Sequence, residues 1–79
     1  MITPADKKVL KRFGENLRKL RKDKGLSLRE MSYACSIDNS KIAKIEKGMI
    51  NITLTTLLQL AVALEAQPAT LLEYSPVEQ

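Results

Sequence analysis

The residues of this chain with the most evident chemistry are its lysines and arginines. All 13 lie between Lys7 and Lys47, so residues 1–48, which also hold six acidic residues, carry a formal charge of +7. Residues 49–79 have three acidic residues and no basic one, which gives that part −3. A surface dominated by positive charge attracts polyanions, although the same residues can also form a solvated helix face. The pattern therefore predicts a polyanion-binding half joined to a half with another task, with a solvated charged helix as the alternative.

Residue types that enzymes use for catalysis are scarce. The 79 residues include no histidine and one cysteine, so the commonest general base and most nucleophile–base pairs are missing. One cysteine forms no disulfide within the chain, and no Cys and His cluster is available for a metal. Cys35 has no basic neighbour on its expected helix face, so we expect a buried packing residue rather than a redox sensor. The sequence predicts no enzymatic activity, no cofactor and no metal.

The length of 79 residues predicts a single domain over residues 1–79. The N-terminus lacks the apolar run of a secretory signal, and no stretch of about 20 apolar residues is present to span a membrane. We therefore expect a cytoplasmic protein with no membrane partner and no small-molecule ligand. A domain this small buries only about 60% of its unfolded surface, so association with a second copy would add stability.

The basic residues must be positioned by helices, the first of which begins at Thr3. Thr3 caps this helix and Pro4 occupies its first turn. Apolar residues recur at steps of three and four and predict one buried stripe, made of Leu10, Phe13, Leu17 and Leu20. Gly25 ends the helix as a left-handed cap. Because glycine weakens a helix interior, two segments hinged near Gly14 remain an alternative.

Two short helices follow. The SLRE sequence from Ser27 is a capping box, and the helix that it starts ends near Ala34 or Cys35. After a three-residue turn, Asp38 caps a third helix that runs to about Lys47.

Thr53 predicts the start of a fourth helix. We expect its apolar face to consist of Leu54, Leu57, Leu58, Ala61 and Leu64. A last short helix begins at Pro68. No segment alternates with period two, so the fold is all-α, and the short helix, turn and short helix over about residues 27–47 form a helix-turn-helix.

Four sequence pieces follow one another at a characteristic spacing within residues 16–72. They read LRKLRKDKG, LSLREMS, IDNSKIAKIEKG and an Asn-x-Thr-Leu turn. Together they resemble the Cro/repressor-type (XRE) helix-turn-helix family of transcriptional regulators, and most of all its stand-alone restriction–modification controller members. The resemblance implies a five-helix, λ-repressor-like DNA-binding domain. It further implies a homodimer that binds an inverted-repeat operator in double-stranded DNA.

The resemblance also implies which residues contact DNA. The base-reading positions match Asn39, Ser40 and Lys44. Asparagine suits an adenine edge, lysine suits guanine O6 and N7, and serine suits either kind of base. The positions implied for phosphate or other DNA contacts are Ser27, Leu28, Lys41, Ala43, Lys47 and Asn51. An ordinary exposed, solvated helix face is the alternative for these polar residues.

Arg21 and Glu46 match the family's structural ion pair, which implies a scaffold role rather than DNA contact. Ile42 and Ile45 are expected in the core. Their expected neighbours are Met31, Leu57 and Leu60.

This chain departs from the family pattern at several positions. Leu28 stands where a phosphate-contacting glutamine is frequent, and Ser36 replaces the usual turn glycine, where a left-handed backbone costs roughly 1–2 kcal/mol. Met49 and Ile50 replace the common basic residues of the loop after the third helix. We therefore expect this loop to bind phosphate more weakly, or to contact thymine methyl groups or a partner instead.

Two questions of partnership remain. Leu71, Leu72 and Tyr74, within residues 68–79, are the dimer-interface candidates by resemblance, and closure of the monomer's own core is the alternative. A two-fold dimer would read half-sites about one helical turn, roughly 34 Å, apart. The rival function is an antitoxin or other protein-interaction module that also binds its own promoter, with Met49 and Ile50 as an exposed apolar contact.

Overall fold

The longest element of the computed structural model, which describes residues 2–73, is α1 (Pro4–Asp23). The Thr3 side chain accepts a hydrogen bond from the Asp6 backbone N–H at 3.1 Å, and the Asp6 carboxylate accepts one from the Thr3 N–H at 3.2 Å. This reciprocal capping box satisfies two of the N–H groups that a helix start leaves without partners. At the other end Gly25 has φ +78°, so both predicted ends of α1 are confirmed.

The possible hinge at Gly14 is wrong, because α1 continues through this residue. Gly14 instead permits a close crossing of two helices. A Cβ at Gly14 would lie 2.4 Å from the carbonyl oxygen of Glu46 and 2.5 Å from that of Ile45. Backbone therefore packs on backbone where α1 passes the C-terminal end of α3 (Asn39–Glu46).

The helix-turn-helix consists of α2 (Leu28–Cys35) and α3. The predicted capping box of α2 is present, with Glu30 N–H donating to the Ser27 hydroxyl at 3.0 Å and Ser27 N–H donating to Glu30 Oε1 at 2.8 Å. Ser36 ends α2 with the left-handed φ of 59° that its place in the turn predicts. Asp38 then caps α3.

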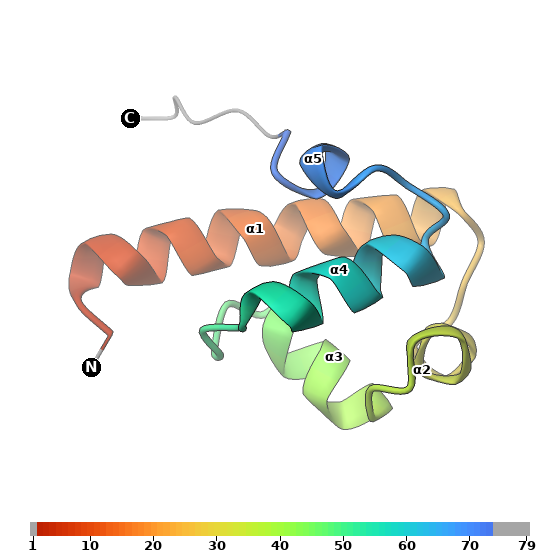
Figure 1. Ribbon diagram of the computed structural model, residues 1–79. Helices are drawn as coiled ribbons and strands as arrows, with labels where there is room; N and C mark the ends of the chain where they lie inside the picture. Colours follow the sequence, from red (N-terminus) through yellow and green to blue (C-terminus); the bar gives the residue numbers. More distant parts are fainter. Residues whose placement is uncertain (1, 74–79) are drawn as a thin grey trace.

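Helices α4 (Leu54–Ala63) and α5 (Pro68–Leu71) complete the described fold. Figure 1 shows α1 running the length of the molecule, with α5 on one side of it and α4, α3 and α2 on the other. All five elements predicted from the sequence are present. Over residues 2–73 there is no strand, and no helix combines the length and apolar character needed to cross a membrane.

Side chains from all five helices meet in one core. The largest fully buried ones are Leu17, Met31, Ile42, Ile45, Leu60 and Leu71. The predicted core positions of α2 and α3 are therefore confirmed, and Leu57 packs against the core while remaining partly exposed. Cys35 is 5% exposed, as expected of a packing residue.

The apolar face predicted for α4 is partly wrong. Leu54 is 69% exposed and Leu58 is 42% exposed, whereas Leu60, Ala61 and Leu64 are buried. Because α4 has apolar residues on most of its circumference, its pattern alone does not identify the side that meets the core.

A long-range contact that the sequence did not suggest fixes α5. The side-chain amide of Asn16 donates to the carbonyl oxygens of Thr70 at 3.2 Å and Leu71 at 2.9 Å. Leu71 has no exposed surface, so it closes the core of its own chain and is not available to a second copy. Leu72 is 54% exposed, and Tyr74 lies outside the described residues.

Candidate nucleic-acid interface

Helix α3 presents two contrasting sides. Ile42, Ile45 and Glu46 are buried on its inner side. Ser40, Lys44 and Lys47 are exposed, and their separations of four and three residues place them together on the outer side. Buried apolar contacts thus fix the helix in a position that exposes a polar, basic surface.

The N-terminal end of α3 is held by Asp38. Its carboxylate accepts a hydrogen bond from the Ser40 N–H at 3.0 Å and another from the Ser40 hydroxyl. These hydrogen bonds, led by that of the hydroxyl, lower the pKa of Asp38 below its ordinary value. Since the Ser40 proton is directed to Asp38, the oxygen of this hydroxyl is left to act as an acceptor.

The remaining predicted residues of α3 flank this outer side. Asn39 and Ala43 are partly buried, and their four-residue separation places them on one flank. Lys41 is exposed and lies on the other flank. Of the three predicted base readers, Ser40 and Lys44 therefore lie on the outer side of α3, whereas Asn39 lies on a flank at its N-terminal end.

The predicted contacts outside α3 are less uniform. Ser27 and Asn51 are exposed. Leu28 is partly buried and packs against the core, so its backbone N–H, in the first turn of α2, is the group that it can offer to an anion. In the loop after α3, Met49 is 59% exposed, but Ile50 packs against the core.

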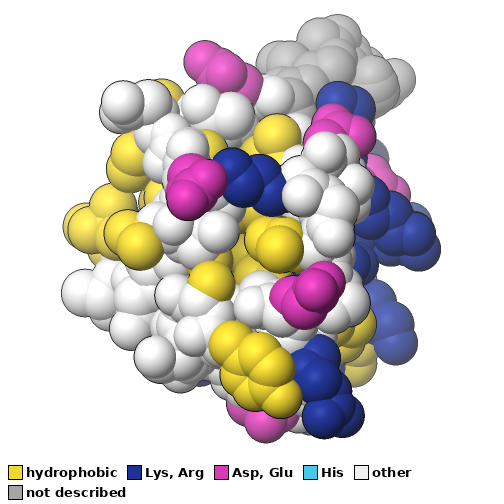
Figure 2. All heavy atoms as spheres, turned by 90° about the vertical axis from the view of Figure 1, so that its right-hand side faces the viewer, with side chains coloured by type: hydrophobic (Ala, Val, Ile, Leu, Met, Phe, Trp, Pro, Cys, Tyr) yellow, Lys and Arg dark blue, Asp and Glu magenta, His cyan; other side chains and the backbone are white. Residues whose placement is uncertain are grey.

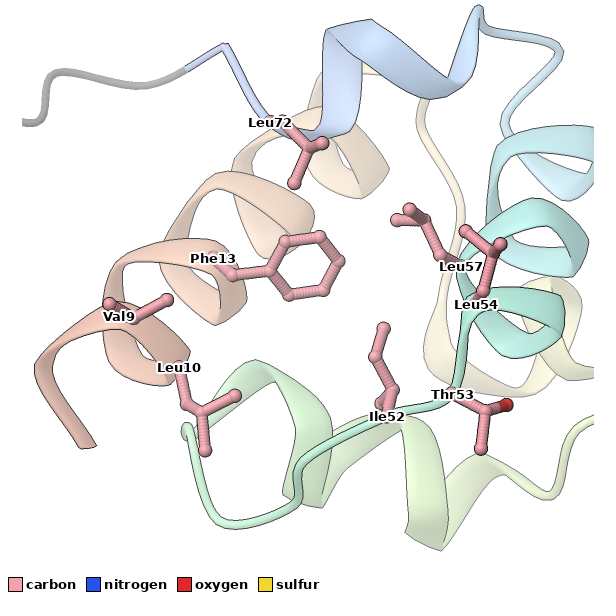
Figure 3. Close-up of a pocket in the computed structure, with 8 residues that line it drawn as sticks. All are labelled: Val9, Leu10, Phe13, Ile52, Thr53, Leu54, Leu57 and Leu72. Carbon is pink, nitrogen blue, oxygen red and sulfur yellow. The ribbon is translucent and has the colours of Figure 1, made fainter. Parts of the chain in front are cut away.

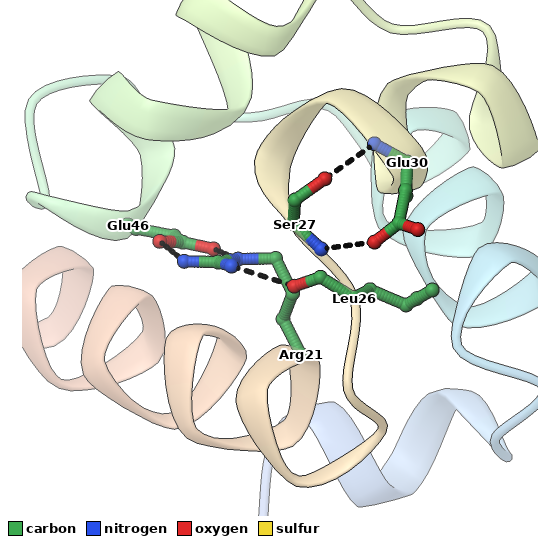
Figure 4. Close-up of polar contacts among 5 residues, drawn as sticks. All are labelled: Arg21, Leu26, Ser27, Glu30 and Glu46. Carbon is green, nitrogen blue, oxygen red and sulfur yellow. Dashed lines mark hydrogen bonds and ion pairs between the residues drawn. The ribbon is translucent and has the colours of Figure 1, made fainter.

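The predicted pair of Arg21 and Glu46 is present and bidentate. Arg21 Nε donates to Glu46 Oε2 at 2.6 Å, and Nη2 donates to Oε1 at 3.0 Å. A third bond runs from Nη1 to the carbonyl oxygen of Leu26 at 2.8 Å (Figure 4). Hydrogen bonding to Glu46 raises the pKa of Arg21, against the lowering effect of burial. One guanidinium thus connects α1, the end of α3 and the segment that leads into α2.

Basic and apolar side chains gather at different edges of the face shown in Figure 2. In Figure 2, Lys and Arg side chains gather along the right edge, whereas apolar side chains gather along the left edge. The exposed apolar residues of α4 are Leu54, Leu58 and Val62, with 69%, 42% and 71% of their surface exposed. Their spacing of four residues makes one continuous stripe, which we call the α4 stripe. The four-residue spacing is visible in the sequence, but the sequence analysis placed Leu54 and Leu58 on the inner face of the helix.

An apolar pocket of about 170 Å³ adjoins the α4 stripe. Figure 3 shows side chains of α1 facing those of α4 and the preceding loop across this pocket. The lining residues are Val9, Leu10, Phe13, Ile52, Thr53, Leu54, Leu57 and Leu72. Since Leu54 belongs to both, the pocket and the stripe form one apolar surface.

Known proteins are similar to this chain in sequence and fold. The control protein C.BamHI of Bacillus amyloliquefaciens is 29% identical over 66 residues, which cover 82% of each chain. The restriction–modification controller C.AhdI of Aeromonas hydrophila is 39% identical, with a TM-score of 0.77 over 78% of this chain and 94% of that one. The controller C.Esp1396I, solved as a tetramer in complex with its natural 35 base-pair operator, is 25% identical, with a TM-score of 0.76 over 82% of this chain and 86% of that one.

Residues 12–73 also match the family described as the helix-turn-helix domain. This range contains α2, α3 and the Arg21–Glu46 pair. The expected resemblance to controller proteins is thereby confirmed, and the chain belongs to the helix-turn-helix domain family as an XRE-type DNA-binding regulator.

Proposed function

We propose that this chain regulates transcription as a homodimer that binds an inverted-repeat operator, with α3 of each protomer in the major groove. The observation that carries this proposal is the outer side of α3, where Ser40, Lys44 and Lys47 are exposed above a buried inner side. An α-helix with its side chains is about 10–12 Å in diameter, which fits the major groove width of about 12 Å. The structure of C.Esp1396I as a tetramer in complex with its operator supports the coarser part of this proposal, which is operator binding by an oligomer.

The base-reading chemistry follows from three side chains. Lys44 donates to guanine O6 and N7, and Asn39 bonds an adenine edge. Ser40 accepts from a cytosine or adenine amino group, because its proton is directed to Asp38. Each good contact contributes about 1–3 kcal/mol of discrimination between bases. Contacts that position the protein without reading sequence come from Ser27, the Leu28 N–H, Lys41, Ala43, Lys47 and Asn51.

The second copy packs on the α4 stripe and Leu72. Residues 49–73 contain no Lys or Arg, so two such surfaces meet without repulsion between cations. Burial of a large apolar side chain contributes roughly 1.5–3 kcal/mol, and association costs about 4–15 kcal/mol. A few such side chains per protomer give a gain of similar size to that cost. We therefore expect a dimer in equilibrium with its monomer, which makes operator occupancy depend steeply on protein concentration.

Selection of bound duplexes from a random pool, with excess nonspecific DNA, tests the function. The expected product is an inverted repeat with half-sites about 34 Å apart. Lys44→Ala should relax the preference at one base position. Lys47→Ala, its matched control, should weaken all sequences alike and reduce the salt dependence by about one unit. Recovery of no motif, or identical behaviour of both variants on matched and scrambled duplexes, would contradict the proposal.

Sedimentation tests the dimer surface. Leu54→Ala combined with Val62→Ala should shift the protein towards monomer, whereas Tyr33→Ala, at a side chain that is 74% exposed on α2, should not. Unchanged association of the double variant would exclude the α4 stripe as the interface. A wild-type protein that stays monomeric would favour a different protein as the occupant, as the antitoxin hypothesis requires.

A further inference from the structure

A second set of basic residues lies on α1, outside the helix-turn-helix. Lys7, Lys11, Arg18 and Lys22 are all exposed and are separated by four, seven and four residues. At 100° per residue these positions fall within roughly 60° around the helix axis. They therefore form one line of positive charge along α1, which we call the α1 stripe.

The α1 stripe differs in its pairing from two lysines near the C-terminal end of α1, Lys19 and Lys24. Lys19 pairs with Asp23 at 3.2 Å, and Lys24 pairs with Glu65 at 2.6 Å. Within residues 2–73, no residue of the α1 stripe forms an ion pair or a side-chain hydrogen bond. In this described part of the chain, these four like charges thus stand in line without a paired anion, and the exposed Glu15, four residues after Lys11 and three before Arg18, forms no ion pair with either of them.

The α1 stripe adjoins the outer side of α3. Lys11 lies three residues before Gly14 and Arg18 lies four residues after it, so these two flank the point where α1 crosses the end of α3. A Cβ at Gly48 would lie 2.7 Å from Lys11 Cα, which places the Lys11 backbone against the residue that follows Lys47.

We propose that the α1 stripe binds the sugar–phosphate backbone of DNA beside the half-site that α3 reads. From Lys7 to Lys22 the stripe extends over 15 helical steps, or about 22 Å, and one DNA strand has a phosphate about every 3.4 Å of helix axis. The stripe is therefore long enough for its four basic side chains to contact several phosphates of one strand. This inference rests on the proposed function and adds contacts that carry no sequence information.

Salt dependence separates true phosphate contacts from distant charge. Each phosphate neutralised by a basic side chain contributes about 0.9 to the slope of log affinity against log salt. Lys11→Gln with Arg18→Gln should therefore reduce the slope by about 1.8 per bound protomer. When the salt concentration rises from 50 to 200 mM, the affinity of both proteins should fall. The factor by which it falls should be about 12 times smaller, per protomer, for the variant than for the wild type. Its base preference should be unchanged.

The matched control is Lys19→Gln with Lys24→Gln, which removes the same two charges from positions already paired within the protein. Both double variants are compared with the wild type on the selected operator with long flanks, after their helix content and unfolding are shown to match. An equal change of slope in both variants would overturn the α1 stripe while leaving the proposed function intact. Failure of the wild type to prefer its selected duplex over a scrambled one would instead overturn the proposed function.

Discussion

The buried pair of Arg21 and Glu46 offers the sharpest test of the scaffold. Glu46 is 8% exposed and receives two hydrogen bonds from Arg21. Arg21→Met leaves that carboxylate buried without its cation, which costs about 3–5 kcal/mol. At about 0.05–0.15 kcal/mol per residue, a chain of 79 residues has a total stability of about 4–12 kcal/mol. The variant should therefore lose about a quarter or more of its stability.

The second half of this test replaces both partners. Arg21→Met with Glu46→Leu removes both charges together, and such exchanges are often neutral or stabilising by about 1–4 kcal/mol. Urea unfolding of the wild type, both single variants and the double variant, followed by circular dichroism, gives the coupling energy. A loss below about 1 kcal/mol for Arg21→Met would refute the reasoning, because an exposed pair behaves in that way. So would a double variant as unstable as the sum of the single ones.

Two further predictions concern single residues. Gly14→Ala should destabilise the protein. Alanine improves helix propensity by about 1 kcal/mol, but its Cβ would lie 2.4 Å from a backbone oxygen. The resulting overpacking costs about 1–3 kcal/mol. Gly25→Ala is the control, because this glycine has open space around it and its replacement measures only the cost of a left-handed backbone. A gain of stability for Gly14→Ala in urea unfolding would contradict the close crossing of α1 and α3. The lowered pKa of Asp38 means that its charge stabilises the fold above the unfolded pKa of about 3.9 and that this contribution is lost as the pH falls through the folded pKa. Asp38→Asn keeps a capping oxygen but removes the titrating carboxylate, so the melting temperature of the variant should fall less steeply on acidification. Parallel curves of melting temperature against pH for variant and wild type would disprove the role of the Asp38 charge.

The helix starts were predictable because their causes are local. Thr3, Ser27 and Thr53 each accept a hydrogen bond from a backbone N–H three residues later. Such bonds depend on the residue types of a single turn and not on the rest of the fold. The starts of α1, α2 and α4 therefore follow from the sequence without knowledge of the tertiary packing.

The inner side of α4 was not predictable in the same way. Its residues read LTTLLQLAVA, with apolar side chains facing most directions. Periodicity identifies a stripe only when the opposite side is polar, and here two apolar stripes compete. Contact with α2 and α5 decides that Leu60 faces inward and Leu54 outward. The resulting outer stripe is the interface candidate, whereas the sequence directed attention to α5.

The proposed DNA-binding surface also depends on a contact that no local pattern encodes. Counting charges places the basic residues in one half of the chain, but Lys11 and Lys47 are far apart in sequence. They become neighbours because Gly14 and Gly48 allow α1 to approach the end of α3. A side chain at Gly14 would push the two helices apart and separate the α1 stripe from α3. Gly14→Ala should therefore weaken the salt dependence of DNA binding as well as stability, under conditions where the variant is still folded. Unchanged salt dependence in that folded variant would mean that α1 and α3 act on DNA independently.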